Sequence, residues 1–172
     1  MNAMPQLEPQ EVEVPPVMAA QLPSHSPTAP SVLTRTMGAA FGALTAYVEE
    51  NRLTHLGPPR ALYKSFDQRE TQFVVAFPVA APDGPLEGER DIKVDRLPGG
   101  KALRFTHKGS YRDLRKTYEA ISSWMAGAGL LESQGAWARY MPVWEEYLND
   151  PQTTPQEELI TQIYIPMDHA KL

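Results

Sequence analysis

Two adjacent acids, Glu145 and Glu146, lie inside an otherwise aromatic and apolar stretch over residues 140–151. In an extended strand successive side chains point to opposite faces, so Glu145 shares a face with Val143 and Tyr147. A carboxylate in that setting is either a solvated edge residue, a salt-bridge partner, or the single charge of a ligand pocket. A register slip of one residue exchanges the two faces, so the pattern leaves open which acid is the pocket residue.

Composition excludes several other kinds of chemistry. The chain of 172 residues has no cysteine, which removes disulfides, thiol nucleophiles and thiolate metal sites. Its four histidines lack ligand spacing, so neither a metal nor a cofactor is expected. No Gly-x-Ser-x-Gly or His-Glu-x-x-His motif supplies an independent catalytic set.

Charge and hydropathy indicate where the protein works. The formal net charge of -5 argues against a phosphate-binding surface, so direct nucleic-acid binding is not expected. The longest apolar run is about half the roughly 20 residues that a membrane span needs. Acidic residues near the N-terminus do not fit a signal peptide, so we expect a cytoplasmic protein without a membrane segment.

The first half of the chain predicts the order strand, helix, strand, strand. Strands are inferred from alternating polarity and the helix from apolar residues every three or four positions. The predicted elements are a strand over 11–22 with a break at Pro15-Pro16, a helix over 31–51 capped by Ser31, and strands over 61–66 and 72–79. Residues 1–10 are predicted to be a disordered tail, and residues 24–30 a loop.

The second half repeats this order after a connection rich in proline and glycine. Its predicted elements are strands over 92–97 and 101–107, a helix from Ser110 to about Gly127, and strands over 140–148 and 158–167. Pro58 and Tyr63 have the same spacing as Pro142 and Tyr147, which indicates an internal duplication of residues 11–79 and 91–167. The sequence therefore predicts one α+β domain over residues 11–167.

That duplication predicts how the elements are arranged. Two β-α-β-β units side by side give a mainly antiparallel sheet with both helices on one face. We expect the other face to curve around a ligand groove between the halves, lined by Glu145 and Tyr63. The aromatic helical stripe of Tyr111, Tyr118 and Trp124 favours the core over the groove.

Several short motifs together resemble a known family. They are His107-Lys108-Gly109-Ser110-Tyr111, then Leu114, Tyr118 and Trp124 at helical spacing, then Pro142 to Pro151, and finally Glu158-Leu159 through Ile165-Pro166. This order and spacing is similar to the GyrI-like small-molecule-binding domain, the effector-binding module of AraC-type and MerR-type regulators, over roughly residues 11–167. The chain shows no helix-turn-helix segment, so direct transcriptional control is not expected.

The resemblance implies a central cleft in which Glu145, rather than Glu146, is the counter-charge for lipophilic cations, as in multidrug-responsive members. Some stand-alone relatives instead use this glutamate to hydrolyse strained electrophiles of the cyclopropanoid type. A third hypothesis is a protein-interaction modulator. The candidate ligand-binding residues are Glu145, Tyr147, Tyr63, Trp137, Phe105 and Tyr111, and Glu145 would be catalytic if the protein is a hydrolase.

We therefore expect a stand-alone binding or sequestering protein for aromatic, cationic small molecules. A carboxylate in an apolar cleft loses hydration, and a hydrophobic cation offsets that loss while ring faces add cation–π attraction. The oligomeric state is open between monomer and homodimer.

Overall fold

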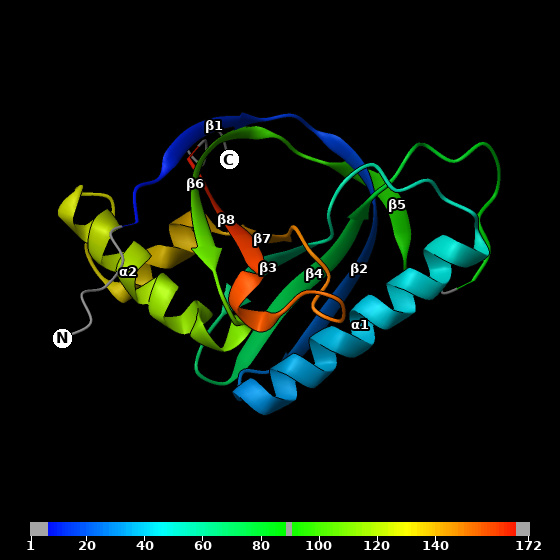
Figure 1. Ribbon diagram of the computed structural model, residues 1–172. Helices are drawn as coiled ribbons and strands as arrows, with labels where there is room; N and C mark the ends of the chain where they lie inside the picture. Colours follow the sequence, from blue (N-terminus) through cyan, green and yellow to red (C-terminus); the bar gives the residue numbers. More distant parts are fainter. Residues whose placement is uncertain (1–6, 89–90, 168–172) are drawn as a thin grey trace.

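The fold is an eight-stranded sheet in which every neighbouring pair of strands is antiparallel. The computed structural model describes residues 7–88 and 91–167. The strands, in chain order, are β1 (Gln10–Val14), β2 (Val17–Pro27), β3 (Arg60–Phe66), β4 (Glu70–Pro78), β5 (Lys93–Leu97), β6 (Gly100–Lys108), β7 (Val143–Tyr147) and β8 (Ile160–Pro166). Their order across the sheet is β1-β6-β8-β7-β3-β4-β2-β5, and the sheet is strongly curled (Figure 1).

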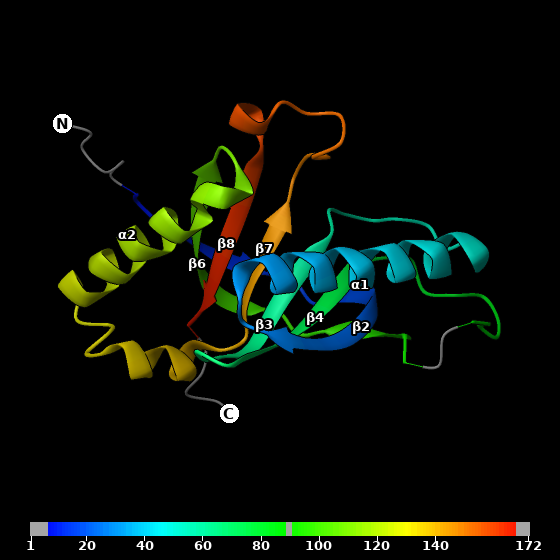
Figure 2. The same ribbon diagram turned by 90° about the horizontal axis from the view of Figure 1, so that it is seen from below.

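Two helices pack on the same side of this sheet. Helix α1 (Pro30–Glu50) covers β2 and β4, and helix α2 (Leu114–Gly127) covers the half that contains β6. Seen from below, α1 lies in front of β3 and β4, α2 lies beside β6, and β7 and β8 are visible between the two helices (Figure 2). Short 3-10 helices complete the fold at Tyr111–Asp113, Gln134–Tyr140 and Gln156–Glu158. None of the helices within the described ranges is long and apolar enough to cross a membrane.

The strand order confirms the predicted duplication of the fold. The unit β2-α1-β3-β4 and the unit β6-α2-β7-β8 meet through β3 and β7 at the centre of the sheet. One strand from each half of the sequence also pairs with the other half, since β1 pairs with β6 and β5 pairs with β2. The halves are therefore interleaved, and Tyr63 and Tyr147 occupy matching places on the two central strands.

Four local predictions differ from the structure. The predicted strand over 11–22 is two strands, β1 and β2, which pair with β6 and β4 respectively. The predicted loop over residues 24–30 is mostly strand, because β2 continues to Pro27 in register with Thr71 and Glu70 of β4. Ser31 is not the cap of α1, which begins at Pro30 after Ala29 with no side-chain cap. Tyr140 ends a 3-10 helix, so β7 begins only at Val143. The predicted tail falls largely on residues 1–6, which lie outside the described residues.

The apolar side chains form three buried clusters that fix the sheet in place. One lies on the concave face of the curled sheet, which is the face opposite the helices, and includes Leu62, Trp144 and Tyr164. The other two lie under the helices, one beneath α1 around Leu44 and Phe73, and one beneath α2 around Phe105 and Ile121. Trp124 packs against the α2 cluster, as its helical stripe predicts. Between the two helices, side chains of β3 and β7 form the surface of the sheet.

Candidate functional site

Strand β7 presents Glu145 to the helix side of the sheet. Glu145 lies between Val143 and Tyr147, and its hydrogen bond to Tyr118 of α2 fixes which face it occupies. Its neighbours across the sheet are Ala61 on β3 and Ile163 on β8. The expectation that Glu145 and Tyr63 line the face opposite the helices is therefore wrong. They lie between the helices, since sequence alternation assigns two faces without saying which one the helices cover.

Three tyrosine hydroxyl groups donate hydrogen bonds to the Glu145 carboxylate. Tyr118 donates to Oε2 at 2.6 Å, while Tyr147 and Tyr63 donate to Oε1 at 2.7 and 3.4 Å. Glu145 retains only 3% of its surface exposure. We call these four residues the Glu145 cluster. The carboxyl group is thus held by neutral hydroxyl donors, and it makes no ion pair within residues 7–88 and 91–167.

Burial shifts the ionisation of every member of the Glu145 cluster. Desolvation raises the pKa of Glu145 above its usual value, although the hydrogen bonds from Tyr118, Tyr147 and Tyr63 and the nearby His107 oppose the shift. The pKa values of Tyr63, Tyr118 and Tyr147 are raised well above 10, first by burial and then by the charge of Glu145. The tyrosines therefore remain hydrogen-bond donors at physiological pH.

His107 ties β6 to α2 behind the Glu145 cluster. Its Nε2 lies 2.9 Å from the carbonyl oxygen of Ser110, which can only accept, so Nε2 carries the proton. In the neutral ring Nδ1 then accepts from the hydroxyl of Thr117 at 2.6 Å. Because Thr117 directly precedes Tyr118, this buried bond helps to place the Tyr118 hydroxyl against Glu145.

Aromatic rings extend from the Glu145 cluster towards both helices. The ring of Tyr147 makes edge contacts with Tyr111 at 5.6 Å and with Phe41 of α1 at 5.9 Å between centroids. Phe41 in turn contacts Phe77, which contacts His55. Such rings can offer their faces to a cation. The arrangement is a buried carboxylate bordered by a row of aromatic side chains.

The structure brings together four of the six candidate ligand-binding residues, namely Glu145, Tyr147, Tyr63 and Tyr111. Phe105 is fully buried against Trp124 beneath α2. Trp137 donates its indole N–H to Ser122, and its partly buried ring packs near Tyr140 against the cluster beneath the same helix. Within residues 7–88 and 91–167, neither side chain makes a hydrogen bond or an aromatic ring contact with the Glu145 cluster.

Sequence reasoning missed Tyr118 and Phe41 as members of the site. Tyr118 was expected in the core because it lies on an apolar helical stripe, yet its hydroxyl makes the shortest bond to Glu145. A tyrosine on such a stripe needs a partner for its hydroxyl when buried, and this need was the available signal. Phe41 carried no comparable signal, since phenylalanine has no polar atom to satisfy.

Glu146 lies on the concave face and has a separate role. Its Oε1 is 3.3 Å from Nε of Arg60, the residue directly across from it on β3. The hydroxyl of Tyr164 lies 3.4 Å from the other carboxylate oxygen. Glu146 is thus a buried ion-pair partner, while Glu145 has no basic partner within bonding distance among the described residues.

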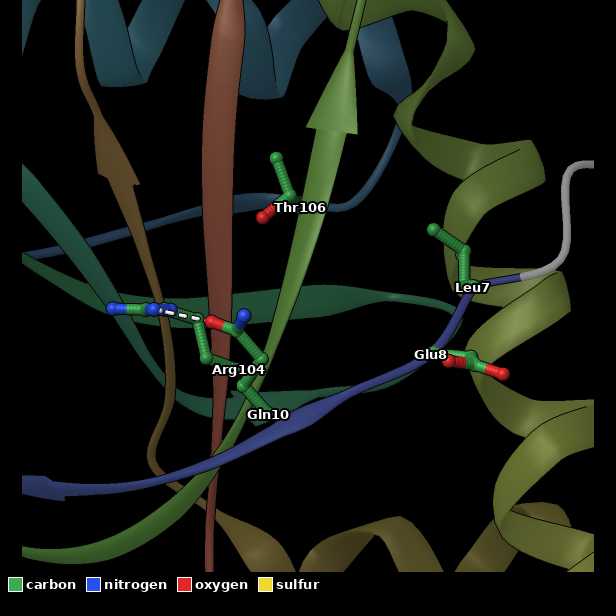
Figure 3. Close-up of a pocket in the computed structure, with 5 residues that line it drawn as sticks. All are labelled: Leu7, Glu8, Gln10, Arg104 and Thr106. Carbon is green, nitrogen blue, oxygen red and sulfur yellow. Dashed lines mark hydrogen bonds between the residues drawn. The ribbon is translucent and has the colours of Figure 1, made fainter.

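Two cavities lie away from the Glu145 cluster. One, of about 390 Å³, is lined by Leu7, Glu8, Gln10, Arg104 and Thr106 where β1 crosses β6, and Arg104 bonds to Gln10 there (Figure 3). The other, of about 270 Å³, includes Arg60 and Trp144. The described part of the chain contains no group of three or more histidine or acidic side chains that could hold a metal.

Comparisons with known proteins agree with this architecture. The family model of the GyrI-like small molecule binding domain matches residues 7–168. No curated protein matches the sequence significantly. The EcmrR C-terminal domain superposes with a TM-score of 0.70 at 18% identity, covering 93% of this chain and 96% of that one.

Two further solved structures share the fold at lower similarity. A protein from Listeria innocua described as a hydrolase has a TM-score of 0.58 at 14% identity, with coverage of 92% and 91% of the two chains. SAV2435 bound to tetraphenylphosphonium has a TM-score of 0.54 at 13% identity, with coverage of 92% and 93%. At these identities the likeness establishes the fold.

Proposed function

Because this chain belongs to the family of GyrI-like small-molecule-binding domains, we propose that it binds lipophilic organic cations against the Glu145 cluster. The observation that carries the proposal is a carboxylate 3% exposed, without a basic partner in the described structure, next to a row of aromatic rings. A buried charge of this kind costs free energy that an approaching cation offsets. The aromatic rings around Tyr147 supply the apolar contact area.

The hydrogen bonds to Glu145 favour one class of cation. Three tyrosine hydroxyls already occupy most of the roughly four acceptor positions of the carboxylate, so a ligand that brings several N–H donors gains little there. A quaternary phosphonium or ammonium ion has no donor to satisfy and interacts through its charge and its apolar surface alone. The tetraphenylphosphonium bound to SAV2435 is an ion of this type. We therefore propose quaternary or delocalised aromatic cations as the ligand class.

Entry to the site requires side chains to move. The carboxylate is closed off in the structure, and the rings of Tyr111 and Phe41 pack on the outer side of Tyr147. Tyr111 is partly exposed and begins a short 3-10 helix rather than a long element. We propose that rotation of the Tyr111 side chain admits the ligand and that its ring then packs against the bound cation.

The test is calorimetric titration of tetraphenylphosphonium and of neutral triphenylphosphine oxide into three proteins. They are the wild type, Glu145→Gln, and Glu119→Gln as a matched loss of one acid on the exposed side of α2. We expect Glu145→Gln to weaken phosphonium binding tenfold or more, about 1.4 kcal/mol, with Glu119→Gln unchanged. Equal affinities in all three proteins, or equal binding of the neutral compound, would refute the role of Glu145.

A hydrolase is the second candidate, and one observation favours it. The raised pKa of the Glu145 carboxyl group, which burial causes, moves it towards the range useful for general acid–base catalysis. Incubation with an electrophilic cyclopropanoid substrate distinguishes the two functions. A hydrolase forms product beyond one equivalent of protein and loses this turnover in Glu145→Gln, whereas a binding protein forms none.

A further inference from the structure

The concave face of the sheet holds a cavity that the Glu145 cluster does not touch. Its volume is about 270 Å³, and its lining includes Arg60, Lys64, Arg96, Leu62, Leu97 and Trp144. Trp144 directly precedes Glu145 on β7, so the two side chains point to opposite faces. Any ligand in this cavity is therefore separated from the Glu145 cluster by the thickness of the sheet.

The charge of the cavity lining is positive. It contains three basic residues, and no Asp or Glu is among the described residues that line it. Arg60 is engaged by Glu146 at 3.3 Å. Lys64 and Arg96 form no ion pair with any carboxylate in residues 7–88 and 91–167. In a chain of net charge -5 this is a local excess of cations that would attract an anion.

Trp144, which also lines this cavity, carries a hydrogen-bond donor that has no partner in the described structure. Its side chain is 7% exposed and stacks on Tyr164 with centroids 4.8 Å apart and planes 8° apart. Its indole Nε1 is buried and has no hydrogen-bond partner in the described structure. Buried indole N–H groups usually find an acceptor, and leaving one without a partner costs free energy. An acceptor supplied by a ligand would recover that cost.

We propose that this cavity is a second binding site, which takes a compact organic carboxylate with an apolar body. The carboxylate would lie near Arg60 and Lys64 and accept from Nε1 of Trp144, and the apolar body would pack on Leu62 and Leu97. The apolar share of the lining argues for an organic anion over inorganic phosphate, since a fully hydrated ion gains nothing from leucine side chains. The site is independent of the function proposed for Glu145 and has the opposite charge preference.

The experiment uses 2-naphthoate and its neutral amide as probes in calorimetric titration of the full chain. The proteins are the wild type, Trp144→Phe, Lys64→Gln and Lys116→Gln. Trp144→Phe keeps a ring that can stack on Tyr164, and Lys116→Gln is the matched control, because Lys116 is an exposed lysine on α2. We expect 2-naphthoate to bind the wild type at least tenfold more tightly than the amide. Trp144→Phe and Lys64→Gln should each weaken it tenfold or more, with no change in Lys116→Gln.

Other outcomes overturn the proposal and leave the Glu145 site unaffected. No binding of 2-naphthoate, or equal affinity in all variants, shows that the cavity is not an anion site. Glu145→Gln is titrated with 2-naphthoate in parallel, and a loss of binding in this variant but not in Lys64→Gln would equally refute the proposal. Circular dichroism checks that Trp144→Phe and Lys64→Gln are folded. Lys64→Gln should fold normally because Lys64 is exposed, so its replacement leaves the core intact.

Discussion

Replacing Tyr118 by phenylalanine isolates the shortest hydrogen bond to the Glu145 carboxylate. The change removes one hydroxyl that lies 2.6 Å from Oε2 and keeps the ring that packs beneath α2. A hydrogen bond to a charged group contributes about 1.5 to 3 kcal/mol, against about 1 kcal/mol for a neutral pair. We expect Tyr118→Phe to lower the free energy of unfolding by about 2 kcal/mol when Glu145 is ionised and by about 1 kcal/mol when it is protonated.

Tyr63→Phe is the matched control for this measurement. Its hydroxyl is 3.4 Å from Oε1, which is too long for a strong bond, so we expect its loss to cost less than about 1 kcal/mol at any pH. Urea unfolding at about pH 4 and about pH 8 gives the free energies of both variants. If Tyr118→Phe costs no more than Tyr63→Phe, or if its cost does not change with pH, the Glu145 cluster does not hold a charge as described.

Three further changes test other parts of the structure. The pKa of Glu145 is raised in the folded protein, so the free energy of unfolding of the wild type should fall as pH rises through that pKa. The slope should be at most about 1.4 kcal/mol per pH unit. Urea titrations of Glu145→Gln should lack this fall. His107→Ala removes two hydrogen bonds, of which the one to Thr117 is buried and the one to Ser110 part-buried, and should cost about 2 to 4 kcal/mol, against about 1 kcal/mol for Thr117→Val. Arg60→Ala leaves Glu146 buried without its partner and should cost about 3 to 5 kcal/mol.

Controls for these changes come from the same chain. The exposed pair of Arg115 and Glu119 has the same charges as the Arg60 pair, and its loss should cost under about 1 kcal/mol. Converting both Arg60 and Glu146 to leucine should restore most of the stability lost in Arg60→Ala. A double variant as unstable as the single one would contradict the view that the unpaired charge causes the loss.

The sequence by itself determined the order and type of the main elements. Alternating and helical periods indicated the strands and both helices, and the matched spacing of Pro58 to Tyr63 and Pro142 to Tyr147 revealed the duplication. These features are local, since each depends on residues a few positions apart. The same reasoning singled out Glu145 as an acid among aromatic residues. It failed where proline and serine in residues 24–30 suggested a loop, because pairing with β4 outweighed that local preference.

Only the tertiary structure decided what surrounds Glu145. Its hydroxyl partners Tyr118 and Tyr63 are 27 and 82 positions away in the sequence, a separation that local periodicity does not bridge. The alternating pattern of β7 does not distinguish its two faces. The packing of α2 against the sheet assigns Glu145 to the helix side. The same packing leaves Glu146 to pair with Arg60. The chemical difference between two adjacent glutamates thus arises from which face of the sheet each one meets.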